Sequence, residues 1–410
     1  MKILIVNNFY SPAGGTEKHI QGIAELLTSN GHEVYFFATN KPPLFYDNYK
    51  YKNYFPQYTD YCTNNMVNNL KYATKIMYNK DAKLKIASLL DVIRPDIVHF
   101  HNIYFHLTPS VLKPVNKLKI PIIMTLHDVR LVCPSGSLRL KDSYYCKNEL
   151  CIRGNPLHCL IHNCKGQKFS RSAAVTAEAL FKKIHKLYDK VNIFICPSQA
   201  LKDLLIRSGK ASEKLVVLNN FIDDSSLSET PEYSINNCFL YAGRLEKEKG
   251  VDLLIKAIAE IPEAKLVIAG TGYEETALKE LASKIGANNV IFKGYLTGEN
   301  LKIEYHKCIA TIQPANWFEN FPMTVLESFA AGRPVIASSI GGLPEMIENG
   351  TNGFLFKPTD KKELVKNLRL ILQDKEFAIQ MGKNARKTAE ENYTASKYYV
   401  KLIDTYKSVL

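Results

Sequence analysis

Short apolar runs alternate with amphipathic stretches along most of the chain. Residues 2–7, 33–39 and 238–242 are runs of this kind, and each gives way to polar residues or glycine. Continuous apolar runs bounded by such residues are typical of strands buried in a parallel sheet, while the intervening 3.6-residue periodicity is typical of helices. The pattern therefore predicts an α/β fold.

The remaining expected elements continue the alternation. Thr16 is the expected N-cap of a first helix that ends before Gly31. Further strands are expected at residues 95–102, 121–126, 192–196, 215–218, 266–269, 290–293, 309–313 and 333–337. Further helices are expected at about 65–90, 171–188, from 198, from about 322, and 394–410.

The length of 410 residues suits two domains, each with its own core. The strand–helix alternation restarts after a polar stretch at 223–237, which is the best linker candidate. We expect a Rossmann-like first domain at residues 1–220, a second at 221–393 and a terminal helix at 394–410.

The formal charge of +13 lies almost entirely in the first half of the chain. Residues 1–220 hold 30 Lys and Arg against 15 Asp and Glu, whereas the remainder is close to neutral. A basic half suits contact with an anionic membrane, and a merely solvated basic surface explains it equally well. The scattered cations form no nucleic-acid module, so no nucleic-acid partner is expected.

The apolar runs are all shorter than the roughly 18 residues that a membrane span requires. The opening run at residues 1–7 is too short for the apolar core of a signal peptide. We therefore expect a cytoplasmic protein, with peripheral contact at the inner face of the membrane as one option.

Two glutamates, Glu319 and Glu327, flank the expected helix start at Pro322. Proline is favoured in a first helical turn because its missing N–H would be unpaired there. The free amides of Met323 and Thr324 would then attract an anion. A carboxylate, an anion site and a second carboxylate in this order match the hydroxyls and diphosphate of a sugar nucleotide. For the pair alone, an ordinary amphipathic helix explains the pattern as well.

The loop at residues 243–250 carries Arg244 and Lys249, five residues apart and flanked by glycines. Arg binds phosphate through a planar fork and Lys as a point charge, so the two can clamp a diphosphate. A charged surface turn is the alternative.

In the first half, Gly14 and Gly15 follow the first strand and His127 follows the strand at 121–126. Paired glycines permit close approach of the backbone to a phosphate or sugar, although a tight turn explains them as well. Ligands of open α/β sheets bind beyond the carboxyl ends of strands, which makes His127 a candidate. His101 and Asp128 occupy similar positions, and their roles stay open.

Five of the nine cysteines lie between residues 133 and 164. Cys146, Cys151, Cys159 and Cys164 form two Cys-x4-Cys pairs that are able to hold a structural zinc ion. Reduced, partly buried thiols are the alternative, since stable disulfides are not expected in the cytoplasm.

Several motifs resemble the retaining glycosyltransferases of family 4. They are Glu319-x7-Glu327 within Glu-Asn-Phe-Pro-Met-x-x-Leu-Glu, Gly-Arg-Leu-x3-Lys-Gly at 243–250, and Thr-Leu-His-Asp at 125–128. The resemblance implies the GT-B fold, in which two Rossmann-like domains face a cleft and a C-terminal helix crosses back to the first domain. A cysteine-rich insert after Leu-His-Asp recurs in some polysaccharide transferases of this family.

The resemblance also implies roles for individual residues. The catalytic set would be His127, which contacts the transferred sugar, Glu319, which holds its hydroxyls, and Arg244 and Lys249, which bind the diphosphate. Glu327 would bind the ribose. The other expected donor-binding residues are Gly14, Gly15, Gly243, Gly294, Asn320, Phe321, Pro322, Met323 and Thr324.

The implied activity is transfer of a sugar from a UDP-sugar or GDP-sugar to a glycan or lipid-linked acceptor. Capsule or O-antigen assembly is the implied setting. No Asp-x-Asp motif occurs, so we expect catalysis without a metal or other cofactor. A sugar-nucleotide epimerase and a catalytically idle, donor-binding scaffold are the alternatives.

Overall fold

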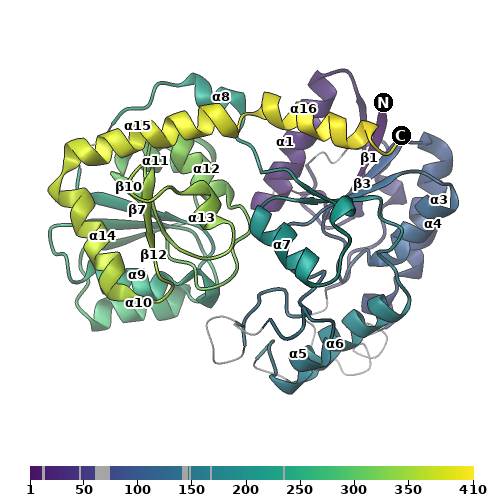
Figure 1. Cartoon of the computed structure of the whole chain (residues 1–410), viewed down its shortest axis with the longest axis horizontal. Helices are drawn as coiled ribbons and strands as arrows, with labels where there is room; N and C mark the ends of the chain where they lie inside the picture. Colours follow the sequence, from purple (N-terminus) through teal and green to yellow (C-terminus); the bar gives the residue numbers. More distant parts are fainter. Residues whose placement is uncertain are drawn as a thin grey trace. The chain divides into compact units, whose positions relative to one another are not determined.

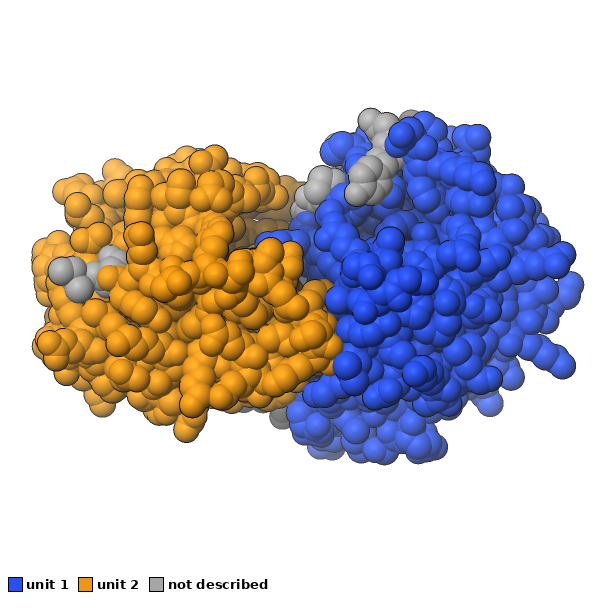
Figure 2. Space-filling model, turned by 90° about the horizontal axis from the view of Figure 1, so that it is seen from above, with its two compact units in different colours: residues 1–218, 399–410 blue, residues 219–398 orange. Residues whose placement is uncertain are grey.

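The computed structural model describes residues 1–11, 14–45, 48–60, 74–140, 146, 149–166, 169–233 and 236–410. The chain forms two compact units, coloured separately in Figure 2. Unit 1 comprises residues 1–218 and 399–410, and unit 2 comprises residues 219–398.

Unit 1 is built on a six-stranded parallel sheet with the strand order β2-β1-β3-β4-β5-β6. Strands β1 and β3 of this sheet are labelled in Figure 1. Its strands are β1 (Lys2–Phe9), β2 (Glu33–Thr39), β3 (Ile97–Phe100), β4 (Ile122–Thr125), β5 (Ile193–Cys196) and β6 (Leu215–Val217). Its helices are α1 (Gly15–Ser29), α3 (Lys80–Ile93), α4 (Leu112–Lys117), α5 (Leu157–Ile161), α6 (Phe169–Ile184) and α7 (Gln199–Arg207), with short 3-10 turns η1 (Lys52–Tyr54), η2 (Pro109–Val111) and η3 (Ser212–Lys214).

Unit 2 holds a second six-stranded parallel sheet, with the order β12-β11-β10-β7-β8-β9. Its strands are β7 (Cys238–Ala242), β8 (Lys265–Ala269), β9 (Val290–Gly294), β10 (Ala310–Gln313), β11 (Val335–Ser338) and β12 (Gly353–Phe356). Its helices are α8 (Asp224–Ser228), α9 (Val251–Ile258), α10 (Glu275–Lys284), α11 (Gly298–Lys307), α12 (Met323–Ala330), α13 (Leu343–Met346), α14 (Lys361–Gln373) and α15 (Lys375–Asn392), with the 3-10 turn η4 (Lys247–Lys249).

The central strands are apolar because both faces of each sheet are covered. Residues 3–6 of β1 are fully buried, as are Phe239 and Ile268 in unit 2. Parallel sheets with covered faces require such continuous apolar runs, and the α/β expectation is confirmed. Read from β9, the strands of unit 2 follow the order 3-2-1-4-5-6 in their sequence of appearance, which is the order of the Rossmann fold.

The last helix, α16 (Ala395–Lys407), begins in unit 2, and residues from Tyr399 onward belong to unit 1. Within unit 1 the Tyr406 hydroxyl lies 2.8 Å from Nδ1 of His99, and Tyr399 lies 3.0 Å from Nε2 of His32. The tail is therefore joined to the first sheet by specific polar contacts.

Three local predictions differ from the structure. Gly14, not Thr16, is the N-cap of α1, with extended backbone and no side-chain cap. The helix expected over 65–90 is interrupted in the described part: residues 74–77 are helical, residues 78–79 are not, and α3 begins at Lys80, where the Asn79 side chain accepts from the amide of Ala82 and caps it. Residues 61–73 lie outside the described part. The polar stretch at 223–237 lies within unit 2 and contains α8.

The described residues contain no helix with the length and apolar character needed to cross a bilayer.

Candidate active site

Unit 2 has a topological switch point between β7 and β10, where the strand order reverses. Ligands of open α/β sheets bind outside the carboxyl ends of the strands at such points. The loop at 243–250 leaves the carboxyl end of β7, and the loop at 314–322 leaves that of β10. Two of the motifs that resemble family 4, at 243–250 and 319–327, are therefore brought to the same place by the sheet order.

Lys249, Trp317 and Glu319 form the polar centre of this site. The Lys249 ammonium donates to Oε1 of Glu319 at 2.6 Å, and the Trp317 indole N–H donates to the same oxygen at 2.7 Å. Lys249 also lies 4.8 Å from the centroid of the Trp317 ring. Their side chains are mostly shielded, with 17% of Lys249 and 8% of Glu319 exposed. The carboxylate is thus held in one orientation by two donors.

Backbone contacts hold the loops around Glu319 close together. The amide of Asn316 donates to the carbonyl of Glu248 at 2.9 Å. Gly250 has a φ of +69°, and a Cβ there would lie 2.1 Å from the carbonyl oxygen of Pro314. A Cβ on Gly341 would lie 2.0 Å from the carbonyl oxygen of Glu319. Only glycine fits these two positions, because any side chain would collide with backbone that cannot move aside.

Gly243 and Gly294 belong to a neighbouring set of glycine turns at the ends of β7, β8 and β9. The amide of Gly243 donates to the Ala269 carbonyl at 3.0 Å, and the amide of Gly270 donates to the Gly294 carbonyl at 2.7 Å. A Cβ on Gly270 would lie 1.8 Å from the carbonyl oxygen of Gly243. These turns bring the ends of β7, β8 and β9 into close backbone contact next to the 243–250 loop.

Arg244 differs from Lys249 because its side chain is 64% exposed. Its guanidinium pairs with Oε1 of Glu246 at 2.7 Å, and its carbonyl accepts from the Tyr241 hydroxyl at 2.8 Å. Burial is the main cause that raises the pKa of Glu246. The backbone at Arg244 is fixed while its charged end faces solvent, so the structure does not place Arg244 in the Lys249–Glu319 network.

Helix α12 starts directly after this network. Pro322 is its N-cap, with extended backbone and no side-chain cap, so the first amides of α12 are left to other partners. The Thr324 hydroxyl accepts from Nε2 of Gln313 at 2.8 Å, and the Tyr305 hydroxyl donates to Oε2 of Glu327 at 3.1 Å. Gln313 and Tyr305 were not identified from the sequence, because their distance along the chain gives no sign of these contacts.

Asn320 and Phe321 complete the loop before α12, and both are buried. The Phe321 carbonyl accepts from Nδ2 of Asn220 at 2.7 Å, and its ring packs edge-on against Tyr393 with centroids 5.4 Å apart. Phe321 thus anchors the backbone of the loop, which is a structural role.

In unit 1, Gly14 is the N-cap of α1 and Gly15 its first residue, at the switch point between β1 and β3. Gly14 is extended, and a Cβ there would lie 3.1 Å from Oε2 of Glu17. Glu17 Oε1 in turn lies 3.4 Å from Nδ2 of Asn7. The first turn of α1 therefore carries a carboxylate beside the glycine pair.

His127 follows β4 and belongs to a row of histidines. Nε2 of His127 lies 2.9 Å from Nδ1 of His101, and the two rings are stacked. The His101 ring is 4.3 Å from that of His99, whose Nε2 lies 2.8 Å from the Thr125 hydroxyl. Burial lowers the pKa of His127 to about 4 and that of His99 to about 3, and the pKa of His101 is lowered well below 6.5 for the same reason. These rings are neutral at pH 7.

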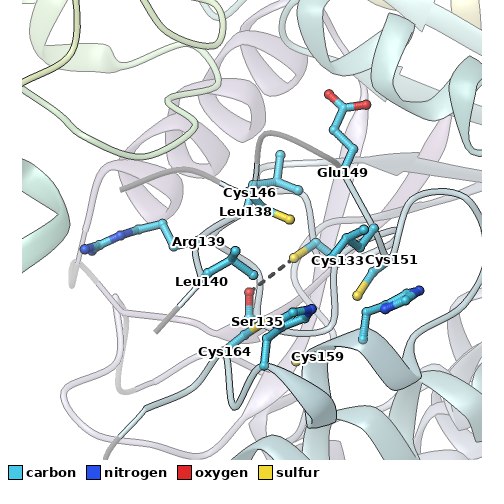
Figure 3. A pocket seen from close by; sticks show the side chains of 13 residues that line it. Cys133, Ser135, Leu138, Arg139, Leu140, Cys146, Glu149, Cys151, Cys159 and Cys164 are labelled. Carbon is cyan, nitrogen blue, oxygen red and sulfur yellow. Dashed lines mark hydrogen bonds between the residues drawn. The ribbon is translucent and has the colours of Figure 1, made fainter. Parts of the chain in front are cut away.

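The five cysteines of the insert line one small cavity, shown in Figure 3. We refer to Cys133, Cys146, Cys151, Cys159 and Cys164 as the cysteine cluster. A hydrogen bond from Cys164 lowers the pKa of Cys159 to about 7, and burial raises that of Cys151 to about 12. Among the residues described, no three His, Cys, Asp or Glu side chains are arranged to hold a metal ion. Zinc binding by Cys146, Cys151, Cys159 and Cys164 stays a prediction, since residues 141–145 and 147–148 beside Cys146 lie outside the described part.

Two sequence families match the two halves of the chain. The profile of Glycosyltransferase Family 4 matches residues 13–226, and that of glycosyl transferases group 1 matches residues 225–388. An uncharacterized glycosyltransferase of Methanocaldococcus jannaschii is 26% identical to the chain, over 99% of the chain and 98% of the relative. The O-antigen chain mannosyltransferase C of Escherichia coli is 29% identical over 43% of the chain and 47% of that protein.

Among solved structures, HepE of Anabaena in complex with UDP-glucose superposes with a TM-score of 0.67 at 20% identity, and the match covers 100% of both chains. This likeness concerns the fold. Because the first profile spans more than half of the chain, the protein belongs to Glycosyltransferase Family 4, and it is a glycosyltransferase with the GT-B fold.

Proposed function

We propose that the protein is a retaining glycosyltransferase that uses a nucleoside-diphosphate sugar. The observation that carries the proposal is the Lys249–Glu319–Trp317 network beside the uncapped start of α12. A fixed carboxylate suits the hydroxyls of a sugar, and the first amides of α12, which no side chain of the described residues caps, suit its diphosphate. The two features lie next to each other in one loop, as they would in a site for a sugar nucleotide.

The cationic groups would act on the leaving diphosphate. The Arg244 side chain is exposed and pairs with Glu246 of its own loop, so its guanidinium is able to swing onto a phosphate. Lys249 already points to the site through Glu319. Together with the α12 amides, these charges would stabilise the departing nucleoside diphosphate without a metal ion. Glu327 would bind the ribose, and Tyr305 would orient it.

His127 would contribute from the first domain, with Gly14 and Gly15 near the donor phosphate and acceptor. Its neutral ring, paired with His101, would serve as a hydrogen-bonding partner for the transferred sugar and not as a cation. This part of the proposal is drawn from the family motif Thr-Leu-His-Asp and from the position of His127 after β4.

UDP-sugars are the first donors to test, since HepE was solved with UDP-glucose, and GDP-sugars are the second. The O-antigen mannosyltransferase among the relatives supports a glycan or lipid-linked acceptor in cell-surface polysaccharide assembly, such as capsule or O-antigen. The basic first half of the chain supports peripheral contact with the inner face of the membrane.

Trp317 provides a direct test because it is the only tryptophan of the chain. Titration with UDP-, GDP-, ADP- and CMP-sugars should change its fluorescence for one nucleotide class, since the indole donates to Glu319. Arg244→Ala should lower kcat/KM by roughly 30- to 1,000-fold, which corresponds to about 2–4 kcal/mol. Lys247→Ala, a matched change in the same loop, should leave kcat/KM within about twofold.

Two results would contradict the proposal. One is a fluorescence signal that no sugar nucleotide changes, and the other is equal activity of Arg244→Ala and Lys247→Ala. Donor conversion without any acceptor would indicate an epimerase instead, and donor binding without turnover would indicate a scaffold.

A further inference from the structure

A second cavity of about 240 Å³ lies wholly within unit 1. Its wall is formed by the segment after β4, the insert near Cys151, the end of α6 and the turn after α7. No residue named in the donor site lines it. A volume below the roughly 300–1,000 Å³ of sites for drug-sized ligands suits a small ligand or a headgroup, not a whole sugar nucleotide.

The lining of this cavity is strongly basic. The lining holds one carboxylate, Asp189, and five cationic side chains, which are Arg130, Lys182, Lys183, Lys186 and Lys210. Arg130 is paired with Asp128 and Lys182 with Glu178, so the excess charge comes from the other three lysines. A concave wall with this excess of one charge concentrates the field and attracts anions. Burial lowers the pKa of Lys210, so an anion in the cavity would also relieve the cost of its partly buried charge.

Arg130 is held rigidly at the cavity. Its Nε donates to Oδ2 of Asp128 at 3.2 Å, its guanidinium lies 4.8 Å from the Phe105 ring centroid, and Gly136 packs against its side chain. Nη1 of Arg130 is buried and has no hydrogen-bond partner among the described residues. A fixed guanidinium with an unused donor is preorganised for an oxyanion.

Tyr188 provides a second, independent sign of a ligand. It lines the cavity and is 5% exposed, and its hydroxyl finds no hydrogen-bond partner within the described part of the chain. Lys182 beside it is buried and paired with Glu178 at 2.8 Å, whose second oxygen also lacks a partner there. Buried polar atoms are nearly always hydrogen-bonded, so the Tyr188 hydroxyl on the cavity wall, unpaired among the described residues, indicates a polar occupant. The Glu178 oxygen is an acceptor outside the lining, so it gives no sign of an anion in the cavity.

We propose that this cavity binds a phosphate-bearing group, either a phosphomonoester or a diphosphate. Arg130 and the lysines supply the charge, and the Tyr188 hydroxyl supplies a neutral donor. The proposal does not depend on the donor assignment, since every residue in it belongs to unit 1.

The phosphate has two possible sources, a free anion or the headgroup of a lipid. Helix α6, whose end lines the cavity, packs against α5 (Figure 1), and the two helices expose four large apolar side chains. These are Leu157, Ile161, Phe169 and Ile184, which are 42%, 69%, 60% and 72% exposed. An apolar chain attached to the phosphate would find partners there, so a prenyl diphosphate belongs in the test beside the free anion.

The first measurement is calorimetric titration of the full-length Arg244→Ala protein with inorganic pyrophosphate. This background weakens binding of pyrophosphate at the donor loop. Lys186→Ser/Lys210→Ser in the same background should weaken binding by roughly tenfold or more, because it removes two cationic partners. Lys117→Ser/Lys190→Ser is the matched control, since it removes two exposed lysines that do not line the cavity, and it should bind like the parent.

Tyr188→Phe removes only the hydroxyl and tests the second observation. It should weaken pyrophosphate binding by several-fold and leave the melting temperature of the free protein unchanged or raised, because an unsatisfied buried hydroxyl is removed. If the double lysine variant does not fold, the affinity of Tyr188→Phe for pyrophosphate still tests the proposal.

Comparison of farnesyl diphosphate with pyrophosphate distinguishes the two sources. Tighter binding of the farnesyl compound, lost again in Lys186→Ser/Lys210→Ser, assigns the site to a lipid headgroup, and equal binding assigns it to a free anion. The proposal is overturned if neither compound binds the Arg244→Ala protein, or if the cavity variants and the control variant bind equally well. Failure of the donor proposal would leave these results unchanged, which keeps the two proposals separable.

Discussion

The Lys249–Glu319 pair allows a quantitative test of how the candidate site is held together. The 2.6 Å contact lies in a shielded place, with 17% and 8% of the two side chains exposed. Lys249→Met leaves the Glu319 carboxylate buried with the Trp317 N–H as the remaining donor of this network. Removal of one partner of a buried ion pair typically costs about 3–5 kcal/mol, and we expect a loss of that order in the free energy of unfolding.

The complementary change, Glu319→Gln, should cost less, about 1–3 kcal/mol, since the more exposed ammonium is able to turn toward water. In Lys249→Met/Glu319→Gln no unpaired charge remains. The double variant should therefore lose clearly less than the sum of the single losses, with a coupling energy of about 2 kcal/mol.

Urea unfolding followed by the fluorescence of Trp317 is the suitable assay, because the chain has no other tryptophan and the signal reports on unit 2. Circular dichroism of the same samples monitors the whole chain. The exposed pair Lys256–Asp252, at 2.9 Å in the same unit, is the matched control. A double-mutant cycle of this pair should give a coupling energy of at most about 0.5 kcal/mol. Additive losses at Lys249 and Glu319, within about 0.5 kcal/mol, would refute the reasoning.

Three further predictions concern the rest of the fold. His99 and His127 have depressed pKa values, so their stabilising contribution is complete above pH 6.5 and falls with pH toward their folded values of about 3 and 4. At pH 5 each histidine should lower the free energy of unfolding by about 2 kcal/mol relative to neutral pH. If the free energy of unfolding of His99→Gln changes with pH as steeply as that of the parent protein, this reasoning is contradicted. Gly250→Ala and Gly286→Ala share a φ of +69°, but only the first places a Cβ against backbone. Gly286→Ala should lower the free energy of unfolding by about 1–2 kcal/mol, and Gly250→Ala should lower it clearly more, as measured by thermal unfolding. Equal losses in the two variants would disprove the steric argument. If the cysteine cluster is a zinc site, metal analysis should find a zinc ion per chain and a chelator should lower the melting temperature; protein purified with zinc that contains far less would exclude it.

The strands and most helices were predictable from local pattern. Each buried strand of a parallel sheet is a short apolar run, and that requirement is visible in residues 238–242 or 33–39 without any tertiary information. The Ser198 cap of α7 and the glycine after α1 were equally local. The error at Thr16 arose because a hydroxyl residue and a glycine compete for the N-cap, and the observed helix starts after Gly14, two residues earlier than expected.

The motifs of the site were also readable in the sequence, because Glu319, Glu327, Arg244 and Lys249 lie in short segments with recognisable spacing. The contacts between these residues, in contrast, could not be read from the sequence. Lys249 and Glu319 are 70 residues apart, and they meet because β7 and β10 are adjacent at the switch point of the sheet. Local spacing carries no information on strand order, so no inspection of either loop alone identifies this ion pair.

The sequence by itself therefore determined the class of fold, the position of its strands and the segments that carry chemistry, since these depend on neighbouring residues. Only the tertiary structure decided which of those segments meet. It joined Tyr305 to Glu327, set the row of histidines beside β3 and β4, and enclosed the basic cavity around Arg130 and Tyr188. Such contacts arise from strand order and helix packing, which are set by burial over the whole domain and not by any short stretch of the chain.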